Sequence, residues 1–156
     1  MKKIISVIGP SESTPKEYKI AFEVGKYLAK NGFIVATGGK SGIMSAALKG
    51  AKEEGGLTIG ILPEQDLSFV NPYVDIPITT GIGEIRNFVL VNAGVVVVSI
   101  GISEGTLIEI SYALKMGKTL FSYNLPEIPH VFEDGRIIRF SDIKEFDEEF
   151  RNFMEV

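Results

Sequence analysis

The chain has 156 residues, 45% of them hydrophobic, which is enough for one domain with a substantial core and too few for two ordinary domains. The formal net charge of −4 offers no basic surface for a nucleic-acid backbone, so nucleic acid is not an expected partner. Cysteine is absent and His130 is the one histidine, so no Cys-based or His-cluster metal site is expected. No cofactor is expected either. The longest apolar run, around Val95 to Ile100, is far shorter than the roughly 20 residues of a membrane span. We therefore expect a single cytoplasmic domain over residues 1–156 with no membrane partner.

Short β-branched runs alternate with amphipathic helical stretches along the chain, a pattern that indicates parallel βαβ units. The predicted strands lie at residues 3–8, 33–37, 58–62, 76–79, 95–100 and 119–123, and the predicted helices at 15–30, 42–54, 83–92 and 106–116. Continuous Val and Ile in the fifth strand indicate burial on both faces of a sheet. The sequence therefore predicts an α/β fold of the Rossmann-like, doubly wound type: a mainly parallel sheet with helices on both faces, in three layers.

Two segments depart from this alternation. Between Pro63 and Pro77 the pattern gives way to prolines and acids, which indicates either a loop over the sheet edge or part of a subunit contact. Turn residues between 126 and 135 mark an irregular connection that leads to a short strand at 136–140 and a last helix. Core packing is the simplest explanation for the apolar residues that recur at helical spacing in that helix: Ile143, Phe146, Phe150 and Phe153.

The stretch from Ala93 to Glu109 runs from a buried strand through a Gly-rich turn into a helix predicted to begin at Thr106. The first backbone N–H groups of a helix attract anions, and Gly101 and Gly105 allow a ligand to approach the backbone closely. Glu109 has two interpretations, because Thr106-x-x-Glu109 is also the pattern of a capping box. The same spacing recurs at Thr14-x-x-Glu17, so the box alone does not identify a site.

Three further loops follow predicted strands, at the sheet edge where open α/β sheets bind their ligands. The first contains Gly9 and Ser11, and the second is TGGKSGIM at 37–44, in which Ser41 is a candidate cap for a helix that starts at Gly42. Lys40 in that loop is either a phosphate neighbour or an exposed lysine. The third loop carries Arg86, whose planar fork of donors suits a carboxylate or a phosphate, with Glu109 as its expected partner. Together these loops predict a phosphate-binding pocket.

Four segments in this order resemble the Lonely Guy-like branch of the SLOG nucleotide-binding superfamily, whose members have been labelled possible lysine decarboxylases. They are VIGPSES at 7–13, ATGGKSGIMSAALKGAKEEGG at 36–56, EIRNFVLVNA at 84–93 and GISEGTLIEISYALKMGKTL at 101–120. The family's Pro-Gly-Gly is replaced by Gly101-Ile102-Ser103, and its Arg-Lys pair stands here as Arg86-Asn87. These departures and the short chain resemble a smaller branch close to molybdenum cofactor carrier proteins. Nothing marks a site for the pyridoxal cofactor that lysine decarboxylation uses.

The resemblance implies a nucleoside 5′-monophosphate phosphoribohydrolase, which cleaves the N-glycosidic bond, with Arg86 and Glu109 as catalytic residues. The alternative is a non-catalytic protein that binds or carries a nucleotide or the pterin-based molybdenum cofactor. In either case the resemblance implies a homodimer or higher homo-oligomer with a contact near helix 83–92. The expected nucleotide- or phosphate-binding residues are Gly9, Ser11, Gly38, Gly39, Ser41, Gly42, Met44, Gly101, Gly105 and Thr106.

Overall fold

The computed structural model describes residues 1–128 and 136–155. In chain order its elements are β1 (Ile4–Ile8), α1 (Pro15–Lys30), β2 (Ile34–Thr37), α2 (Ile43–Glu53), β3 (Thr58–Leu62), β4 (Ile76–Thr79), the 3₁₀ turn η1 (Gly83–Ile85), α3 (Arg86–Ala93), β5 (Val96–Ile100), α4 (Glu104–Lys115), β6 (Thr119–Tyr123), β7 (Arg136–Arg139) and α5 (Ile143–Met154). Within the described residues, the strands form one seven-stranded sheet in the order β4-β3-β2-β1-β5-β6-β7, and every neighbouring pair is parallel.

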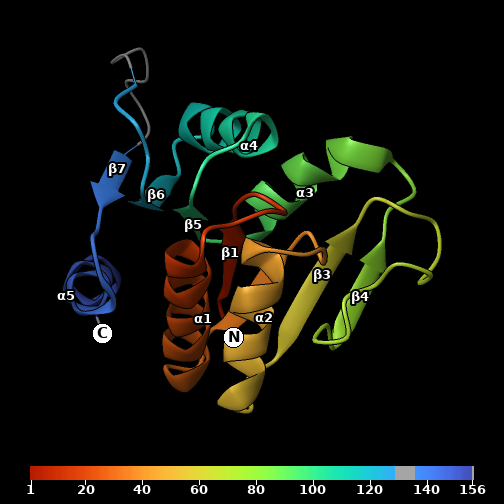
Figure 1. Ribbon diagram of the computed structural model, residues 1–156, viewed down its shortest axis with the longest axis horizontal. Helices are drawn as coiled ribbons and strands as arrows, with labels where there is room; N and C mark the ends of the chain where they lie inside the picture. Colours follow the sequence, from red (N-terminus) through yellow and green to blue (C-terminus); the bar gives the residue numbers. More distant parts are fainter. Residues whose placement is uncertain (129–135, 156) are drawn as a thin grey trace.

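The sheet is the middle of three layers (Figure 1). Helices α1, α2 and α5 pack on one face, and α3 and α4 pack on the other. Strand β5 packs against both helical layers, because Val96 and Val98 lie in the core with α1, α2 and α5, and Val97 lies in the core with α3 and α4. The predicted Rossmann-like α/β fold, with helices on both faces, is confirmed.

Helix α1 begins where the sequence predicts, at a complete capping box. The Thr14 hydroxyl accepts the Glu17 N–H at 3.1 Å, and the Glu17 carboxylate accepts the Thr14 N–H at 3.3 Å. At the other end of the chain, Phe146 and Phe150 of α5 are fully buried against Phe121 and one another. The apolar stripe of the last helix therefore packs into the core.

Two predicted helix starts are wrong. Helix α2 begins at Ile43, and Ser41 does not cap it: the Ser41 hydroxyl donates to the Ser11 carbonyl, while Gly42 takes the N-cap position at φ +65°. Helix α4 begins at Glu104, two residues before the predicted start. Its N-cap is Ser103, whose hydroxyl accepts the Thr106 N–H at 3.2 Å, so Thr106 and Glu109 do not form a capping box.

The segment from Pro63 to Asp75 connects β3 to β4, the strand at one edge of the sheet, and Pro77 lies within β4. Whether this segment also forms part of a subunit contact stays a prediction. At the opposite edge, β7 is the short strand expected at 136–140. Most of the irregular connection before it, and His130 with it, lies outside the described residues. Among the helices in the described ranges, none combines the length and apolar character needed to cross a membrane.

Candidate ligand-binding site

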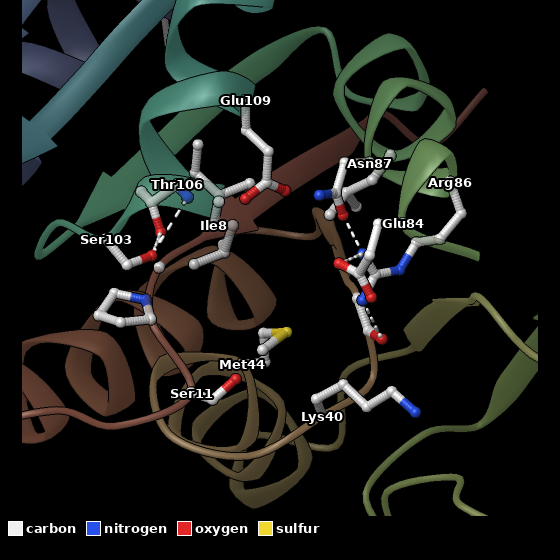
Figure 2. Close-up of a pocket in the computed structure, with 16 residues that line it drawn as sticks. Ile8, Ser11, Lys40, Met44, Glu84, Arg86, Asn87, Ser103, Thr106 and Glu109 are labelled. Atoms are coloured by element: carbon white, nitrogen blue, oxygen red, sulfur yellow. Dashed lines mark hydrogen bonds and ion pairs between the residues drawn. The ribbon is translucent and has the colours of Figure 1, made fainter.

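A pocket lies at the carboxyl end of β1, the central strand of the sheet. From β1 the chain proceeds outward through β2, β3 and β4, and then returns to pair β5 with the other side of β1. This reversal is the topological switch point at which open α/β sheets bind ligands. The pocket is lined from the loops that follow β1 and β2, from the start of α2, from η1 and α3, and from the beginning of α4 (Figure 2).

Eight of the twelve predicted site residues line this pocket: Gly9, Ser11, Gly38, Met44, Arg86, Gly105, Thr106 and Glu109. They come from four segments that are widely spaced in the sequence, either the loops after β1 and β2 or the beginnings of α2, α3 and α4, so the expected convergence at the strand ends is present. Ligand binding by these residues stays a prediction.

The other four predicted residues, Gly39, Ser41, Gly42 and Gly101, are not among the lining residues in the part of the chain that the structure describes. Three of them have backbone roles. Gly39 and Gly42 hold positive φ angles of 71° and 65° in the turn into α2. Gly101 has φ +78° after β5, and its N–H donates to the Tyr123 carbonyl at 3.0 Å. These glycines shape the loops that carry the pocket.

Gly38 lets the loop after β2 pass close to two side chains of the pocket. A Cβ at this position would lie 2.8 Å from Arg86 Nη2 and 3.0 Å from Met44 Sδ. Gly105 is the opposite case, because a Cβ there would meet nothing within 4 Å. Gly38 therefore permits close packing against Arg86 and Met44, and Gly105 leaves space beside the start of α4.

Arg86 is buried at the first position of α3 and is held in one orientation. Its Nε donates to the Ile61 carbonyl at 2.9 Å, its Nη2 to the Gly38 carbonyl at 3.5 Å, and its Nη1 to the side-chain oxygen of Asn87. Within the described residues, its ion pair is with Glu84, with Nη1 and Oε2 3.6 Å apart. The expected ion pair with Glu109 is therefore absent, because neighbouring carbonyls and the exposed Glu84 occupy the guanidinium.

Glu109 lies in the second turn of α4 with its carboxyl group directed into the pocket (Figure 2). The residue is only 7% exposed. Burial raises the pKa of Glu109 to about 8, while the positive charge of Arg86 opposes the rise and the negative charge of Glu84 adds to it. At neutral pH this carboxyl group is therefore mostly protonated, so its O–H is able to donate a hydrogen bond and the group does not repel an anion.

Four further polar residues line the pocket: Lys40, Glu84, Asn87 and Ser103. The sequence leaves two interpretations open for Lys40, and it does not predict the other three as site residues. Glu84 and Asn87 flank Arg86 in the EIRN segment, and Ser103 directly precedes the acidic first residue of α4, a pattern typical of an N-cap. The site thus combines two cations, two carboxyl groups, an amide and hydroxyls, which suit a ligand with an anionic group and a polar ring.

Fold and pocket together define a Rossmann-like protein with a polar pocket at its strand ends. The chain belongs to the SLOG cluster4 family, whose model matches residues 2–146. This membership confirms the resemblance to the SLOG superfamily. An uncharacterized protein from Archaeoglobus fulgidus is 40% identical over 124 residues, which cover 80% of this chain and 82% of the relative.

Two solved structures resemble the chain over nearly its whole length. The molybdenum cofactor carrier protein of Chlamydomonas reinhardtii is 34% identical with a TM-score of 0.89, and the match covers all of both chains. The molybdenum cofactor binding protein of Rippkaea orientalis is also 34% identical, with a TM-score of 0.87 and coverage of 99% of this chain and 98% of that one. The expected closeness to molybdenum cofactor carriers is confirmed as a structural similarity.

A more distant likeness bears on the expected absence of a nucleic-acid partner. DNA processing protein A from Helicobacter pylori, which binds single-stranded DNA, is 21% identical with a TM-score of 0.65 over 98% of this chain and 79% of that one. The likeness shows the fold alone. Since this fold also occurs in a DNA-binding protein, the expectation that nucleic acid is not a partner rests on charge only.

Proposed function

We propose that this protein binds and carries a phosphate-bearing small molecule, either the molybdenum cofactor or a nucleotide, without hydrolysing it. The observation that carries the proposal is the pocket at the switch point, where buried Arg86 and protonated Glu109 face the same space. The similarity to two molybdenum cofactor-binding proteins over nearly the full chain favours the cofactor as the first ligand to test.

The residues of the pocket fit such a ligand. Arg86 places a fixed positive charge in the lining of the pocket, which favours a phosphate, and the space beside Gly105 allows an anionic group to approach the first turn of α4. The Asn87 amide and the carboxyl groups of Glu84 and Glu109 supply hydrogen-bonding partners for the polar edge of a pterin or a purine base. No cysteine is available for a metal, so the cofactor would be held through its organic part.

The hydrolase that the sequence resemblance implies finds less support in the site. The role that the resemblance implies for Glu109, which is to activate water or to stabilise positive charge on the sugar, needs an ionised carboxylate. With a pKa of about 8, Glu109 is ionised in only about a tenth of molecules at pH 7. Pairing with Arg86 would increase that fraction, but the guanidinium is committed to Glu84 and to backbone carbonyls.

A ligand panel tests the proposal. The melting temperature is measured with the molybdenum cofactor, AMP, GMP, adenosine and inorganic phosphate, and release of free base from AMP is followed by chromatography. At a ligand concentration 100 times the dissociation constant, binding to the native state adds about 2.7 kcal/mol and raises the Tm by roughly 5–10 °C in a domain of this size. We expect stabilisation by a phosphate-bearing ligand and no base release. A flat Tm across the panel contradicts binding, and base release that disappears in Glu109→Gln contradicts carriage without hydrolysis.

The expected homo-oligomer has a candidate surface on η1, α3 and α4. Ile85 and Ile108 are 63% and 55% exposed, and Phe88, Val89 and Leu107 are also exposed. Exposed apolar side chains gathered on neighbouring elements are typical of protein contacts. We propose that a second copy of the chain covers this surface. Light scattering after size exclusion tests the idea: Ile108→Lys should shift the protein toward the monomer, whereas Leu67→Lys, at an exposed residue of the β3–β4 connection, should not.

A further inference from the structure

Lys40 lines the pocket, but its ammonium group does not point into it. In Figure 2 the side chain extends away from Met44 and Ser11, toward the connection between β3 and β4. There Lys40 forms an ion pair with Glu64, and its Nζ lies 5.8 Å from the centre of the Phe69 ring. The Lys40 ammonium group is thus held beside Glu64 and Phe69, two residues of the β3–β4 connection.

The β3–β4 connection, which carries Glu64 and Phe69, also contacts the backbone of Lys40. The Asn71 side chain donates to the Lys40 carbonyl at 3.0 Å, and its own oxygen accepts the Tyr73 N–H at 2.9 Å. On the other side of Phe69, the Asp66 carboxylate accepts the Ser68 N–H at 2.9 Å. Residues 64–73 therefore hold a carboxylate and an aromatic ring beside the pocket lysine, although Phe69 itself is 72% exposed.

The contact between Lys40 and Glu64 is accessible to water and easily exchanged. The two side chains are 26% and 25% exposed, and ion pairs at such positions contribute little net stability. A lysine ammonium sits on a flexible four-carbon stem and moves among partners by bond rotation alone. A hydrogen bond from Lys40 is the largest cause of the lowered pKa of Glu64, and the positive charge of Arg86 lowers it further. Glu64 therefore remains an anion within the positive field of the site.

We propose that Lys40 is a ligand-binding residue that exchanges the Glu64 carboxylate for the anionic group of the ligand, so that Glu64 competes directly with that group. The inference rests on the proposed function and adds to it two residues that set the preference for anionic ligands. It predicts opposite effects at the two ends of one ion pair. A purely structural role for the pair would instead make both substitutions act in the same direction.

The test measures the affinity of AMP and of adenosine, which lacks the phosphate, for wild-type protein, Glu64→Gln, Lys40→Met and the double variant by titration calorimetry. Glu64→Gln should bind AMP about twofold to fivefold more tightly, because a weak internal competitor is removed. Lys40→Met should bind AMP at least about tenfold more weakly, as expected for loss of a charge-assisted hydrogen bond. The double variant should match Lys40→Met, and adenosine affinity should change in none of them.

The chain offers a matched control in Lys26, which forms an ion pair with Glu54 and lies 5.9 Å from the centre of the Phe22 ring. These residues are not among those that line the pocket in the described structure. Lys26→Met and Glu54→Gln should therefore leave AMP affinity unchanged.

Two kinds of failure are distinguishable. Wild-type protein that binds neither AMP nor inorganic phosphate overturns the exchange, and it overturns the nucleotide branch of the proposed function as well. Wild-type protein that binds AMP while Glu64→Gln binds it equally or more weakly overturns the exchange alone. The exchange is also overturned if Lys40→Met weakens adenosine as much as AMP, because the lysine would then act on the pocket's shape.

Discussion

Replacing Glu109 by Gln removes a buried carboxyl group that titrates at different pH values in the folded and unfolded states. In the unfolded chain the group has its ordinary pKa of 4.5, and burial raises the pKa in the folded protein to about 8. Below pH 4.5 both states are protonated. Between pH 4.5 and 8 the folded state keeps a proton that the unfolded state has released, so the free energy of unfolding falls as the pH rises. Above pH 8 the fall ends.

The magnitude follows from the size of the shift. Each pH unit in this window costs the wild-type protein about 1.4 kcal/mol, and the whole window up to about 5 kcal/mol. Glutamine has nearly the same shape and does not titrate. Glu109→Gln should therefore gain stability relative to wild type by about 1.4 kcal/mol per unit from pH 5 to pH 8, and the difference should level off above pH 8.

Urea unfolding at pH 5, 6, 7, 8 and 9 measures the effect, in buffers without phosphate so that no ligand enters the pocket. Glu148→Gln is the matched control, because Glu148 is an exposed residue in the middle of α5. Its difference from wild type should stay within about 0.5 kcal/mol. A difference between wild type and Glu109→Gln that does not change from pH 5 to pH 8 would refute the reasoning, and so would one that favours wild type more as the pH rises. An unchanging difference that favours wild type would mean that Glu109 is ionised throughout this range, as a partner of Arg86 would be.

Two further predictions concern stability. Gly42→Ala should lower the free energy of unfolding in urea by at least about 2 kcal/mol, because Gly42 has φ +65° and a Cβ there would collide with the Ser11 carbonyl oxygen. Gly105→Ala should be neutral or stabilise by up to about 1 kcal/mol, because a Cβ at Gly105 would meet free space. Equal losses at both glycines would contradict this prediction. Phe146→Ala should lower the free energy of unfolding by about 3–5 kcal/mol, because the ring is fully buried among other aromatic rings. Phe69→Ala, at an exposed ring, should change it by less than about 0.5 kcal/mol. A small loss at Phe146 would show that α5 does not stabilise the core.

The sequence predicts the elements of this fold well because their signals are local. Continuous Val and Ile identify β5, and Thr14 with Glu17 identifies the start of α1. The start of α4 is different, because Ser103 and Thr106 are both suitable caps. In the structure Ser103 is the cap, and it follows a turn in which the Gly101 N–H bonds to the Tyr123 carbonyl on the neighbouring strand. That contact is between residues far apart in the sequence, so the local pattern could not decide between the two caps.

In the candidate site, too, some features follow from the local sequence and others depend on contacts between distant residues. Placing loops at the ends of parallel strands was enough to bring Arg86 and Glu109 into one pocket. The partners of these side chains could not be predicted, because Arg86 bonds to the Ile61 carbonyl on β3, and Glu109 is isolated by burial. The orientation of Lys40 likewise depends on Glu64, which is brought near by the β3–β4 connection.

The central position of β1 has a consequence for how the protein is made. Ile5 pairs with Val96, so one side of this apolar strand has no neighbour until β5 leaves the ribosome. At usual rates of synthesis, that interval lasts roughly 5–20 s. In the described parts of the chain, each strand pairing is parallel and joins segments far apart in the sequence, a topology that folds slowly. The pocket is complete only after Glu109 has been added, so the nascent chain carries exposed apolar surface long before it is able to bind any ligand.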